Sequence, residues 1–545
     1  ITKKEAVRRV EPEPLEQFLF PIFDPDDKKK FEILTKGLAA SPGAASGTVA
    51  LDAQTAVELS KQGKRVILVT KETSPDDIHG MSAAAGLLTA RGGRTSHAAV
   101  VGRQMGKVCV VGAEEIKVNI KNRNFSVKDK LIHEGDYISI DGFEGKVYKG
   151  DIPVVASEVI QVMQGDMKEI ASERYGIFST ILKWADSFKR LKIRTNADVP
   201  VDAEIAIKFG AEGIGLCRTE HMFFAEDRIK IMQDMILSTD TNSRIKELNK
   251  LQEMQKKDFV GLFTAMKGFP CTIRLLDPPL HEFLPKREDL MLEVKELEIL
   301  DNNPDELRKK KALLDRVEEL HEFNPMLGLR GCRLGITMPE ITRMQVRAIF
   351  EAAIEVQKKK IKVLPEIMVP LVSMVTEIKF QKDIINDVAR EVLGKKKINY
   401  MVGTMIEVPR AAAVADQIAK EAEFFSFGTN DLTQTVFAFS RDDAGQIINT
   451  YMETKVELDD KKVEILSKDP FTSIDVNGVG EFMKMGYEKG KNTRKSLKVG
   501  ICGEHGGDPQ SIEFCHKIGL DYVSCSPFRV PIARLAAARV ALDDD

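Results

Sequence analysis

The feature that most constrains the fold is a series of short apolar runs that alternate with helical-period segments through the C-terminal part of the chain. Eight such runs follow in the order Lys192–Asn196, Gly213–Cys217, Thr272–Leu276, Glu366–Val369, Tyr400–Ile406, Phe424–Phe427, Leu497–Ile501 and Tyr522–Cys525. Eight strand–helix units over roughly 350 residues predict a TIM barrel with insertions. A doubly wound open sheet is the alternative, and we expect the barrel domain to occupy residues 191–545.

The remainder of the chain divides by composition. Residues 1–36 are charged and contain prolines, and we expect a linker or the remnant of a missing N-terminal region. Residues 37–150 contain short β-rich runs with glycine turns, which predict one small α/β domain. Residues 151–190 are helical in pattern and charged, as in a stiff connector, and residues 450–476 read as an insertion between the sixth and seventh strands. The predicted fold class is therefore α/β throughout.

Composition excludes several functional classes. The 545 residues include 80 basic and 83 acidic side chains, a net charge of −3 that gives no indication of a nucleic-acid or membrane partner. No uncharged apolar run approaches the roughly 18 residues of a membrane span. The seven cysteines are scattered and form no CxxC pair, which is typical of reduced thiols. We therefore expect a cytoplasmic protein, and a plastid or other organelle is not excluded.

Polar residues follow several of the predicted strands, at the end where TIM barrels carry their reactive groups. Two of them are carboxylates, Glu407 after the fifth run and Asp431 after the sixth. Two carboxylates, with water and substrate oxygens completing the coordination, suit Mg²⁺. A salt bridge at the barrel mouth is the alternative role for each of them.

Three arginines and a cysteine extend this set. Arg218, Arg274 and Arg330 offer planar guanidinium groups to carboxylate or phosphate oxygens, although pairing with structural Asp and Glu side chains would explain them as well. Magnesium together with several arginines indicates a small, highly anionic substrate. Cys502 follows a hydrophobic run and precedes a glycine-rich turn, so it is either a proton donor with a tuned pKa or an inert packing residue.

The segment Gly92–Ala99 places His97 just after two glycines, where a helix over residues 98–105 would begin. Thr95 is a suitable N-cap, and Gly106 would close the helix. A helix N-terminus disfavours imidazolium and can hold a phosphoryl group through backbone N–H groups, with Arg94 as a further clamp. His97 is therefore either a phosphorylated catalytic histidine or a histidine that packs near the cap.

Taken together, the motifs resemble the pyruvate, phosphate dikinase family from about residue 37 to residue 540. The segments that carry the resemblance are residues 215–224 (GLCRTEHMFF), 274–285 (RLLDPPLHEFLP), 403–410 (GTMIEVPR), 425–434 (FSFGTNDLTQ) and 500–507 (GICGEHGG). Phosphoenolpyruvate synthase and enzyme I of the sugar phosphotransferase system share the histidine motif and the GTNDLTQ run. The DPPLHEFLP run and the CGEHGG turn favour the dikinase, and the two relatives remain the alternative.

The resemblance implies a three-step reaction in which ATP, phosphate and pyruvate give AMP, pyrophosphate and phosphoenolpyruvate. His97 would carry the phosphoryl group to the barrel, Glu407 and Asp431 would bind Mg²⁺, and Cys502 would protonate the methylene carbon in reverse. Arg218, Arg274, Arg330, Asn430, Thr429 and Gly428 would bind the substrate, and the barrel would form a homodimer.

Two departures from the family pattern matter. The family's N-terminal ATP-grasp domain is absent from these residues, so we expect only phosphoryl exchange between His97 and pyruvate. Arg94 stands where many dikinases carry Met. Thr95 occupies the place of a regulatory phosphorylation site in plant members. Outside the transferases, the alternative is a module that senses phosphoenolpyruvate without labelling His97.

Overall fold

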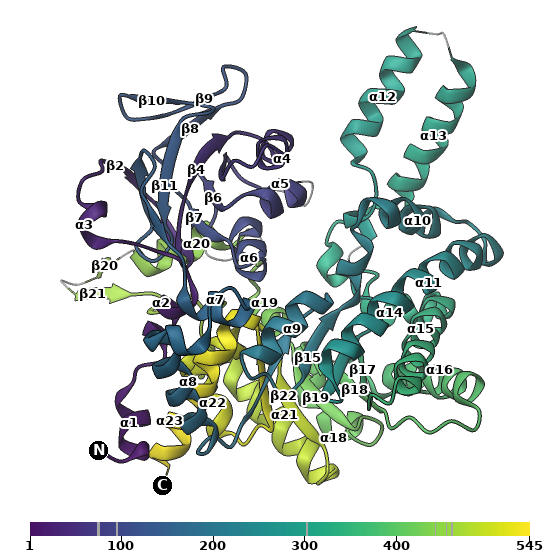
Figure 1. The fold of residues 1–545 in the computed structure, drawn as a ribbon. Coiled ribbons are helices and arrows are strands. Elements are labelled where there is room, and N and C mark those ends of the chain that lie inside the picture. Colours follow the sequence, from purple (N-terminus) through teal and green to yellow (C-terminus); the bar gives the residue numbers. More distant parts are fainter. Residues whose placement is uncertain are drawn as a thin grey trace.

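The computed structural model of the chain describes residues 1–73, 77–93, 96–278, 280–300, 303–441, 443–453, 455–458 and 461–544. The eight expected strands close into a barrel, which excludes the open-sheet alternative (Figure 1). All neighbouring pairs are parallel, and Arg218 lies opposite Arg274 in the ladder. The strands are β14 (Lys192–Asn196), β15 (Ile214–Arg218), β16 (Pro270–Arg274), β17 (Leu364–Val369), β18 (Met401–Ile406), β19 (Phe424–Phe427), β22 (Lys498–Ile501) and β23 (Tyr522–Cys525).

Amphipathic helices surround the barrel, and most of them pack their apolar side into the hydrophobic cluster that contains the strands. In α15 (Pro339–Lys358) the buried residues Val346, Ile349, Phe350 and Ala353 recur at the spacing of one helix face. The other helices of the barrel are α9 (Pro200–Lys208), α10 (Glu226–Leu237), α11 (Thr241–Met266), α14 (Gly331–Thr337), α16 (Val375–Leu393), α17 (Pro409–Ala413), α18 (Ala415–Ile418), α19 (Thr429–Phe437), α21 (Val479–Thr493), α22 (Pro509–Lys517) and α23 (Val530–Asp543).

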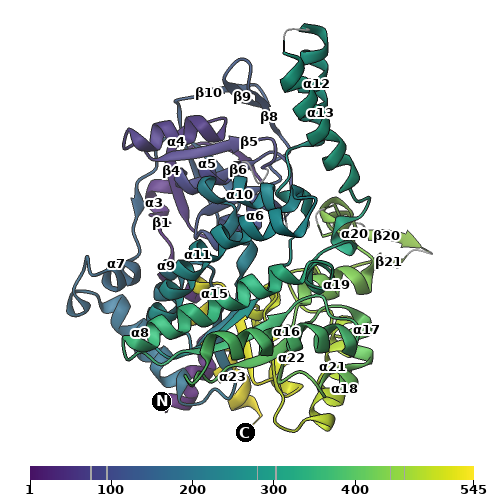
Figure 2. The ribbon, with the colours of Figure 1, turned by 90° about the vertical axis from the view of Figure 1, so that its right-hand side faces the viewer.

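An antiparallel pair of helices projects from the barrel between β16 and β17 (Figures 1 and 2). It consists of α12 (Arg287–Leu300) and α13 (Pro304–Glu319). The lysine run 309–311 lies on α13, where Lys310 and Lys311 pair with Glu293 and Glu298 of α12. These lysines therefore form a solvated, ion-paired face, as mixed-charge helices usually do.

The second domain is built on an eight-stranded mixed sheet whose strand order is β2-β12-β11-β4-β5-β6-β7-β3. Alternate residues of β5 face opposite sides: Val66 and Leu68 pack under helices, while Ile67 and Val69 join the core on the other face. The strands are β2 (Ile33–Lys36), β3 (Leu38–Ser41), β4 (Ala44–Ala50), β5 (Val66–Thr70), β6 (Gly86–Thr89), β7 (Val108–Val111), β11 (Tyr137–Asp141) and β12 (Lys146–Lys149). The expected small α/β domain is present.

Both faces of this sheet are covered. Helices α4 (Ala53–Lys61), α5 (Ile78–Ala83) and α6 (His97–Gln104) cover one face. A three-stranded antiparallel sheet, β8 (Ile116–Asn119), β9 (Asn124–Val127) and β10 (Lys130–His133), contributes Phe125, Val127 and Ile132 to the core of the other face. Because neither hydrophobic cluster includes a barrel residue, the domain has a core of its own.

The two segments that flank this domain lie side by side. Strand β1 (Ile22–Phe23) pairs with β13 (Val154–Val155), so the chain enters and leaves the domain through one two-stranded ribbon. The segment before β1 holds α1 (Lys3–Arg9) and α2 (Glu16–Leu19), and the segment after β13 holds α7 (Glu158–Gln164) and α8 (Glu173–Asp186). Val7, Leu19, Phe178 and Leu182 from these helices are buried in the barrel's own hydrophobic cluster.

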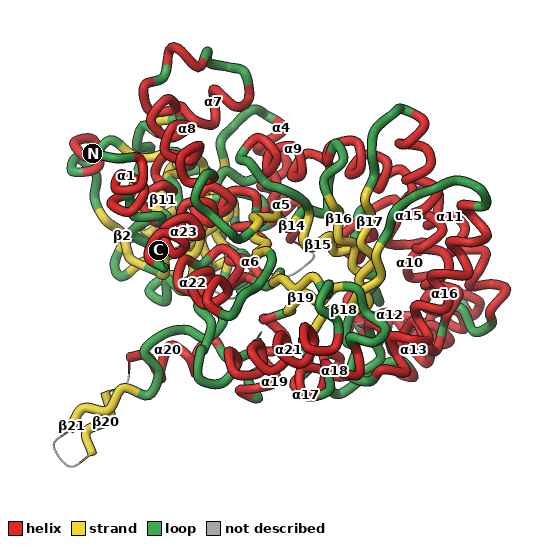
Figure 3. Tube along the Cα trace, turned by 90° about the horizontal axis from the view of Figure 1, so that it is seen from below, coloured by secondary structure: helices red, strands yellow, loops and turns green. Residues whose placement is uncertain are grey.

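The segment between β19 and β22 departs from the barrel pattern, as expected of an insertion. It contains α20 (Gly445–Glu453) and a hairpin of β20 (Lys455–Leu458) and β21 (Lys461–Glu464). Ala444, Ile448 and Phe471 form a separate small cluster beneath it. Figure 3 shows the hairpin extending away from the barrel.

Candidate active site

The barrel gathers the predicted site residues at one end, where its parallel strands finish. Arg218 and Arg274 are the last residues of β15 and β16, and Glu407 and Cys502 directly follow β18 and β22. Asp431 lies in the first turn of α19, immediately after β19. Five strands that are separate in the sequence therefore direct charged or reactive side chains to a common mouth.

Glu407 is the centre of this mouth and is fully buried. Its Oε1 accepts a hydrogen bond from the Leu371 N–H at 2.6 Å, whereas its Oε2 has no hydrogen-bond partner. A Cβ at position 428 would lie 2.9 Å from that Oε2, so a side chain at Gly428 would crowd the free oxygen. Burial raises the pKa of Glu407 well above its usual value, and the negative charges of Asp431 and Asp277 raise it further.

Asp431 lies next to Glu407, but its pKa is shifted in the opposite direction. Burial alone would raise its pKa, but the positive charge of the Arg330 guanidinium lowers it overall. The pair therefore holds one negative charge readily, with a proton on the other carboxyl, and a second negative charge only if a cation lies between the carboxylates. A hard divalent cation fits this donor set, because it would satisfy the free Oε2 of Glu407.

The described residues contain no group of three or more His, Cys, Asp or Glu side chains arranged around a metal position. A cation at Glu407 and Asp431 would thus take its remaining ligands from water and substrate. This is the coordination that Mg²⁺ commonly adopts in sites that handle phosphates.

Two of the predicted arginines are held by a carboxylate that the sequence reasoning did not assign. Asp277 accepts from Arg330 Nε at 2.9 Å and from Arg330 Nη2 at 2.7 Å, and its Oδ2 lies 3.0 Å from Arg274 Nη1. Glu220 accepts a further hydrogen bond from Arg274. The Nε–H of Arg274 is buried without a partner, so the site contains an unused donor as well as an unused acceptor. Asp277 and Glu220 follow strands and lie within the family-like segments 274–285 and 215–224, but no role was predicted for either.

Arg218 is free to meet a ligand. Its backbone N–H donates to Asp198 Oδ1 at 2.5 Å, which anchors the end of β15. His221 Nδ1 lies 2.8 Å from the other oxygen of Asp198. Within the described part of the chain, the Arg218 guanidinium itself has no hydrogen-bonding or carboxylate partner, and it is only half-buried.

Residues around the start of α19 hold the neighbouring loop. Asn430 Oδ1 accepts from the Glu504 N–H at 3.1 Å. His505 is fully buried, and burial lowers its pKa, so it is neutral. Its Nε2 lies 2.8 Å from the Pro470 carbonyl and must carry the proton, so its Nδ1 accepts from the Thr429 hydroxyl at 2.7 Å. The Thr429 side chain is therefore engaged within the protein.

Cys502 is almost completely buried at the end of β22. Its N–H donates to the Phe427 carbonyl at 3.1 Å, which continues the barrel ladder by one residue. Burial raises the pKa of its thiol to about 11. At neutral pH this group is a protonated thiol, suited to giving up a proton rather than acting as a free thiolate.

The other predicted functional residue lies in the small domain. His97 is the first residue of α6, so the helix begins one residue earlier than expected and places this position in its first turn. Gly92, with φ of +108°, and Gly106, with φ of +63°, lie before and after the helix. Arg94 and Thr95 lie outside the described residues.

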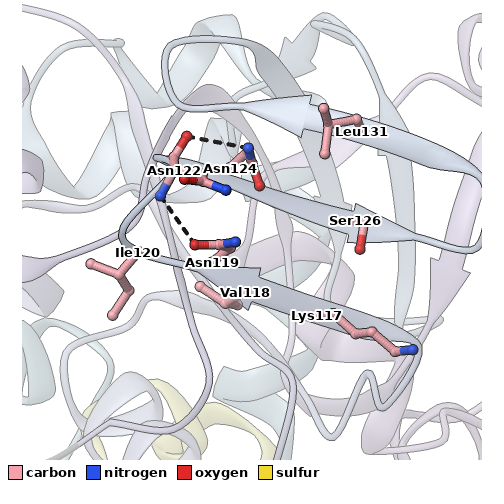
Figure 4. A pocket seen from close by; sticks show the side chains of 8 residues that line it. All are labelled: Lys117, Val118, Asn119, Ile120, Asn122, Asn124, Ser126 and Leu131. Atoms are coloured by element: carbon pink, nitrogen blue, oxygen red, sulfur yellow. Dashed lines mark hydrogen bonds between the residues drawn. The ribbon is translucent and has the colours of Figure 1, made fainter.

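A hollow elsewhere in the small domain does not share these properties. It lies over the three-stranded sheet and is lined by Lys117, Val118, Asn119, Ile120, Asn122, Asn124, Ser126 and Leu131 (Figure 4). Its asparagines bond to one another and to nearby backbone, as when Asn119 Oδ1 accepts from the Asn122 N–H at 3.0 Å. With one lysine and no carboxylate, this hollow lacks the paired charges of the barrel mouth.

The fold defines a (β/α)₈ barrel protein with buried carboxylates and arginines at its mouth and a separate histidine-bearing domain. Residues 172–542 match the family model described as "PEP-utilising enzyme, PEP-binding domain", where PEP is phosphoenolpyruvate. Residues 62–145 match "PEP-utilising enzyme, mobile domain". The chain belongs to the PEP-utilising enzymes.

Several proteins with assigned names are similar to the chain over its whole length. The chain is 52% identical to pyruvate, phosphate dikinase of Clostridium symbiosum over 547 residues, which covers 100% of this chain and 59% of the relative. The corresponding protein of Rhizobium meliloti is also 52% identical, with 100% and 57% covered. The chloroplastic enzyme 1 of Arabidopsis thaliana is 50% identical, with 99% and 53% covered. The chain thus spans little more than half the length of these relatives. None of its described helices is long and apolar enough to cross a membrane.

Proposed function

We propose that this chain catalyses reversible, Mg²⁺-dependent phosphoryl transfer between His97 and pyruvate, giving phosphoenolpyruvate, as part of a pyruvate, phosphate dikinase. One observation carries the proposal: the barrel mouth buries an unpartnered acceptor, Glu407 Oε2, beside an unpartnered donor, Arg274 Nε–H. A bound cation and an anionic substrate would satisfy both. The names of the relatives supply the particular reaction.

Each side chain has a task in this reaction. Glu407 and Asp431 would hold Mg²⁺, which supplies positive charge where negative charge develops on the substrate oxygens. Arg218, with no carboxylate partner in the described chain, would bind the transferred phosphoryl group or the substrate carboxylate. Arg274 and Arg330 are already oriented by Asp277, so they reach the substrate without reorganising. Asn430, Thr429 and Gly428 would shape the adjoining edge.

The transfer itself exchanges two bonds. In the direction of phosphoenolpyruvate synthesis, the bond from phosphorus to the His97 imidazole breaks as a bond from phosphorus to the keto oxygen of pyruvate forms. A methyl proton of pyruvate is taken by Cys502 in its thiolate form, after the thiol has lost its own proton to solvent. In reverse, the Cys502 thiol, protonated at neutral pH, returns that proton to the methylene carbon while the phosphoryl group moves back to His97.

The wider context belongs to the same proposal. We place the functional division at residues 37–150 for the phosphohistidine carrier and 191–545 for the barrel, with 1–36 and 151–190 between them. The ATP and phosphate steps would depend on an ATP-grasp domain, and the barrel would form a homodimer. Seven buried free thiols fit a reducing compartment such as the cytoplasm or a plastid. Regulation at Thr95 is also part of the proposal.

Incubation with radiolabelled phosphoenolpyruvate and Mg²⁺ tests the proposal. We expect an acid-labile label that maps to His97, is absent from His97→Ala and is discharged by added pyruvate. Binding of phosphoenolpyruvate without any label would contradict transfer and would indicate a sensor. Passage of the label to a small carrier protein would instead identify an enzyme I of the phosphotransferase type.

A further inference from the structure

Helix α6, which begins at His97, touches the barrel domain at its C-terminal turn. Gly106 follows this helix and rests on the ring of Phe528, so that a Cβ added at position 106 would lie 2.7 Å from Phe528 Cε2 and 3.2 Å from Cζ. Phe528 belongs to a 3₁₀ turn, η8 (Pro527–Arg529), that directly follows the last barrel strand. Only a residue without a side chain fits between this turn and the ring.

Displacement of the Phe528 ring would disrupt its packing against two other aromatic rings. It lies between Phe20, with ring centroids 5.3 Å apart, and Phe209, with ring centroids 5.6 Å apart. Phe20 and Phe209 are themselves buried. The next residue, Arg529, forms a salt bridge with Glu16 of α2 at 2.5 Å. The aromatic ring is therefore a firm surface presented to the turn at Gly106.

The loop before α6 makes a second contact with the barrel domain. A Cβ added to Gly93 would lie 3.7 Å from the Cα of Gly445, the first residue of α20. Two glycines from distant parts of the chain thus bring their backbones into close approach. Helix α20 lies between β19 and β22, and only its last residues fall within the insertion expected at residues 450–476.

These contacts connect two bodies that each have their own core. The hydrophobic clusters of the small domain contain no barrel residue. Residues 62–145, which include Gly93 and Gly106, match a family model whose description calls the domain mobile. Small contacts between separately packed bodies can form and break as a unit.

We propose that Phe528 and Gly445 form a seat on the barrel domain that receives the two ends of α6 and so positions His97 for transfer at the barrel mouth. The proposal rests on the proposed function, because it names the surface on which the carrier helix docks for that reaction. Phe528 and Gly445 are positioning residues: they act through the placement of α6 and touch no substrate.

The decisive variant is Gly106→Ala, compared with Gly63→Ala. Gly63 also follows a helix of the small domain with positive φ, +79° against +63° for Gly106, but a Cβ there would meet nothing within 4 Å. Both substitutions strain the backbone, and only Gly106→Ala collides with the seat. The double variant Gly106→Ala with Phe528→Ala removes the collision.

Docking is measured by electron–electron double resonance between spin labels at Lys121→Cys, in the small domain, and Lys358→Cys, on the barrel. Both positions are exposed, and all seven native cysteines are buried. We expect the parent and Gly63→Ala to show the interdomain distance of the structure. Gly106→Ala should lower the docked-to-undocked ratio about tenfold or more, as overpacking does. The double variant should match Phe528→Ala alone.

The catalytic readout is the rate at which phosphoenolpyruvate labels His97. We expect Gly106→Ala to slow labelling about tenfold with unchanged affinity for phosphoenolpyruvate, and Gly63→Ala to label like the parent. Equal distances and equal rates for the two alanine variants would overturn the seat. Failure of the parent itself to become labelled would refute the proposed function, while the distance measurement would still decide whether the seat exists.

Discussion

Two buried glutamates in the same barrel differ in how completely their carboxylates are paired, and we propose a functional role only for the incompletely paired one. Glu366 of β17 lies inside the barrel below the mouth, and Glu407 lies at the mouth; both are almost completely buried. Glu366 accepts from Arg194 at 2.7 Å, from the Thr272 hydroxyl at 2.8 Å and from Lys498. Burial would raise the pKa of Glu366, but Arg194 and Lys498 lower it to about 2.

The charges around Glu407 shift its pKa in the opposite direction from that of Glu366. Its neighbours Asp431 and Asp277 add to the effect of burial and raise its pKa, and one of its oxygens has no partner. A buried charge that the protein leaves incompletely paired costs stability, unless a ligand completes it. The two carboxylates are equally buried, but only Glu366 has a full set of hydrogen-bond and ion-pair partners. This difference separates the proposed site at the mouth from the interior of the barrel.

Glu407→Gln should produce the largest change in function. It removes the negative charge that would hold the cation, so we expect labelling of His97 by phosphoenolpyruvate to slow about 10³-fold, or ~4 kcal/mol in the transition state. The unfolding free energy should not fall, because the substitution replaces a buried carboxyl group that has an oxygen without a hydrogen-bond partner. Denaturant unfolding and labelling kinetics on the same sample measure the unfolding free energy and the labelling rate. A Glu407→Gln variant that is destabilised but fully active would show that Glu407 is the structural carboxylate.

Glu366→Gln should show the reverse pattern. Without this carboxylate, Arg194 keeps a buried charge with no ion-pair partner, and we expect the unfolding free energy to fall by about 3 kcal/mol. Its phosphoenolpyruvate affinity should stay within about twofold of the parent, since the change lies beneath the mouth. Urea denaturation and calorimetry measure this change in unfolding free energy. An unchanged unfolding midpoint would show that the contacts of Glu366 do not stabilise the barrel.

The pH dependence of the unfolding free energy should also reveal the contribution of the Glu366 carboxylate. The pKa of Glu366 is lowered from 4.5 to about 2 in the folded chain, so its contribution is fully present above pH 4.5 and is lost as the pH falls toward 2. We expect the difference in unfolding free energy between the parent and Glu366→Gln to be constant from pH 7 to 5 and to shrink below that. A difference that grows on acidification would have the wrong sign.

Cys502→Ser should affect proton transfer more than binding. We expect exchange of the pyruvate methyl protons with solvent to slow about 10²-fold, because the serine hydroxyl is a much poorer proton carrier. Phosphoenolpyruvate affinity should be retained. Since burial raises the pKa of the Cys502 thiol to about 11 and proton removal needs the thiolate, exchange in the parent should become faster as the pH rises from 6 to 9. Proton exchange followed by NMR tests this, and undiminished exchange in the variant would remove Cys502 from the mechanism.

His505→Gln should have the smallest effect. The neutral ring links Thr429 to the Pro470 carbonyl, and its replacement loses about one good hydrogen bond, or ~1 kcal/mol of unfolding free energy. We expect less than a tenfold change in phosphoenolpyruvate affinity. A loss as large as that of Glu407→Gln in the labelling assay would place His505 in the chemistry instead of the loop.

Local sequence patterns predicted most of the architecture. Apolar runs specify buried parallel strands, so all eight barrel strands were found within two residues of their observed bounds. The position of polar residues after those strands also predicted that Glu407, Asp431, Arg274 and Cys502 would meet. These signals depend on neighbours in the chain, which a sequence displays directly.

Pairings across the fold could not be predicted in this way. Asp277 follows a strand as several other carboxylates do, and its partner Arg330 lies 53 positions further along. Residues 1–36 were expected to form a linker or the remnant of a missing N-terminal region because they are charged and contain prolines. Val7 and Leu19 of this segment are buried in the hydrophobic cluster of the barrel. In each case the deciding energy comes from a tertiary contact, which composition does not record.

The most direct test of this account is titration of Mg²⁺ into the chain in the presence of phosphoenolpyruvate, by calorimetry in buffers of different ionisation enthalpy. If Glu407 and Asp431 form an incomplete cation site, one Mg²⁺ binds per chain, and the dependence of the measured heat on the buffer counts the protons released. Binding should persist in Glu366→Gln and disappear in Glu407→Gln. Equal Mg²⁺ binding by Glu407→Gln and the parent would contradict the account.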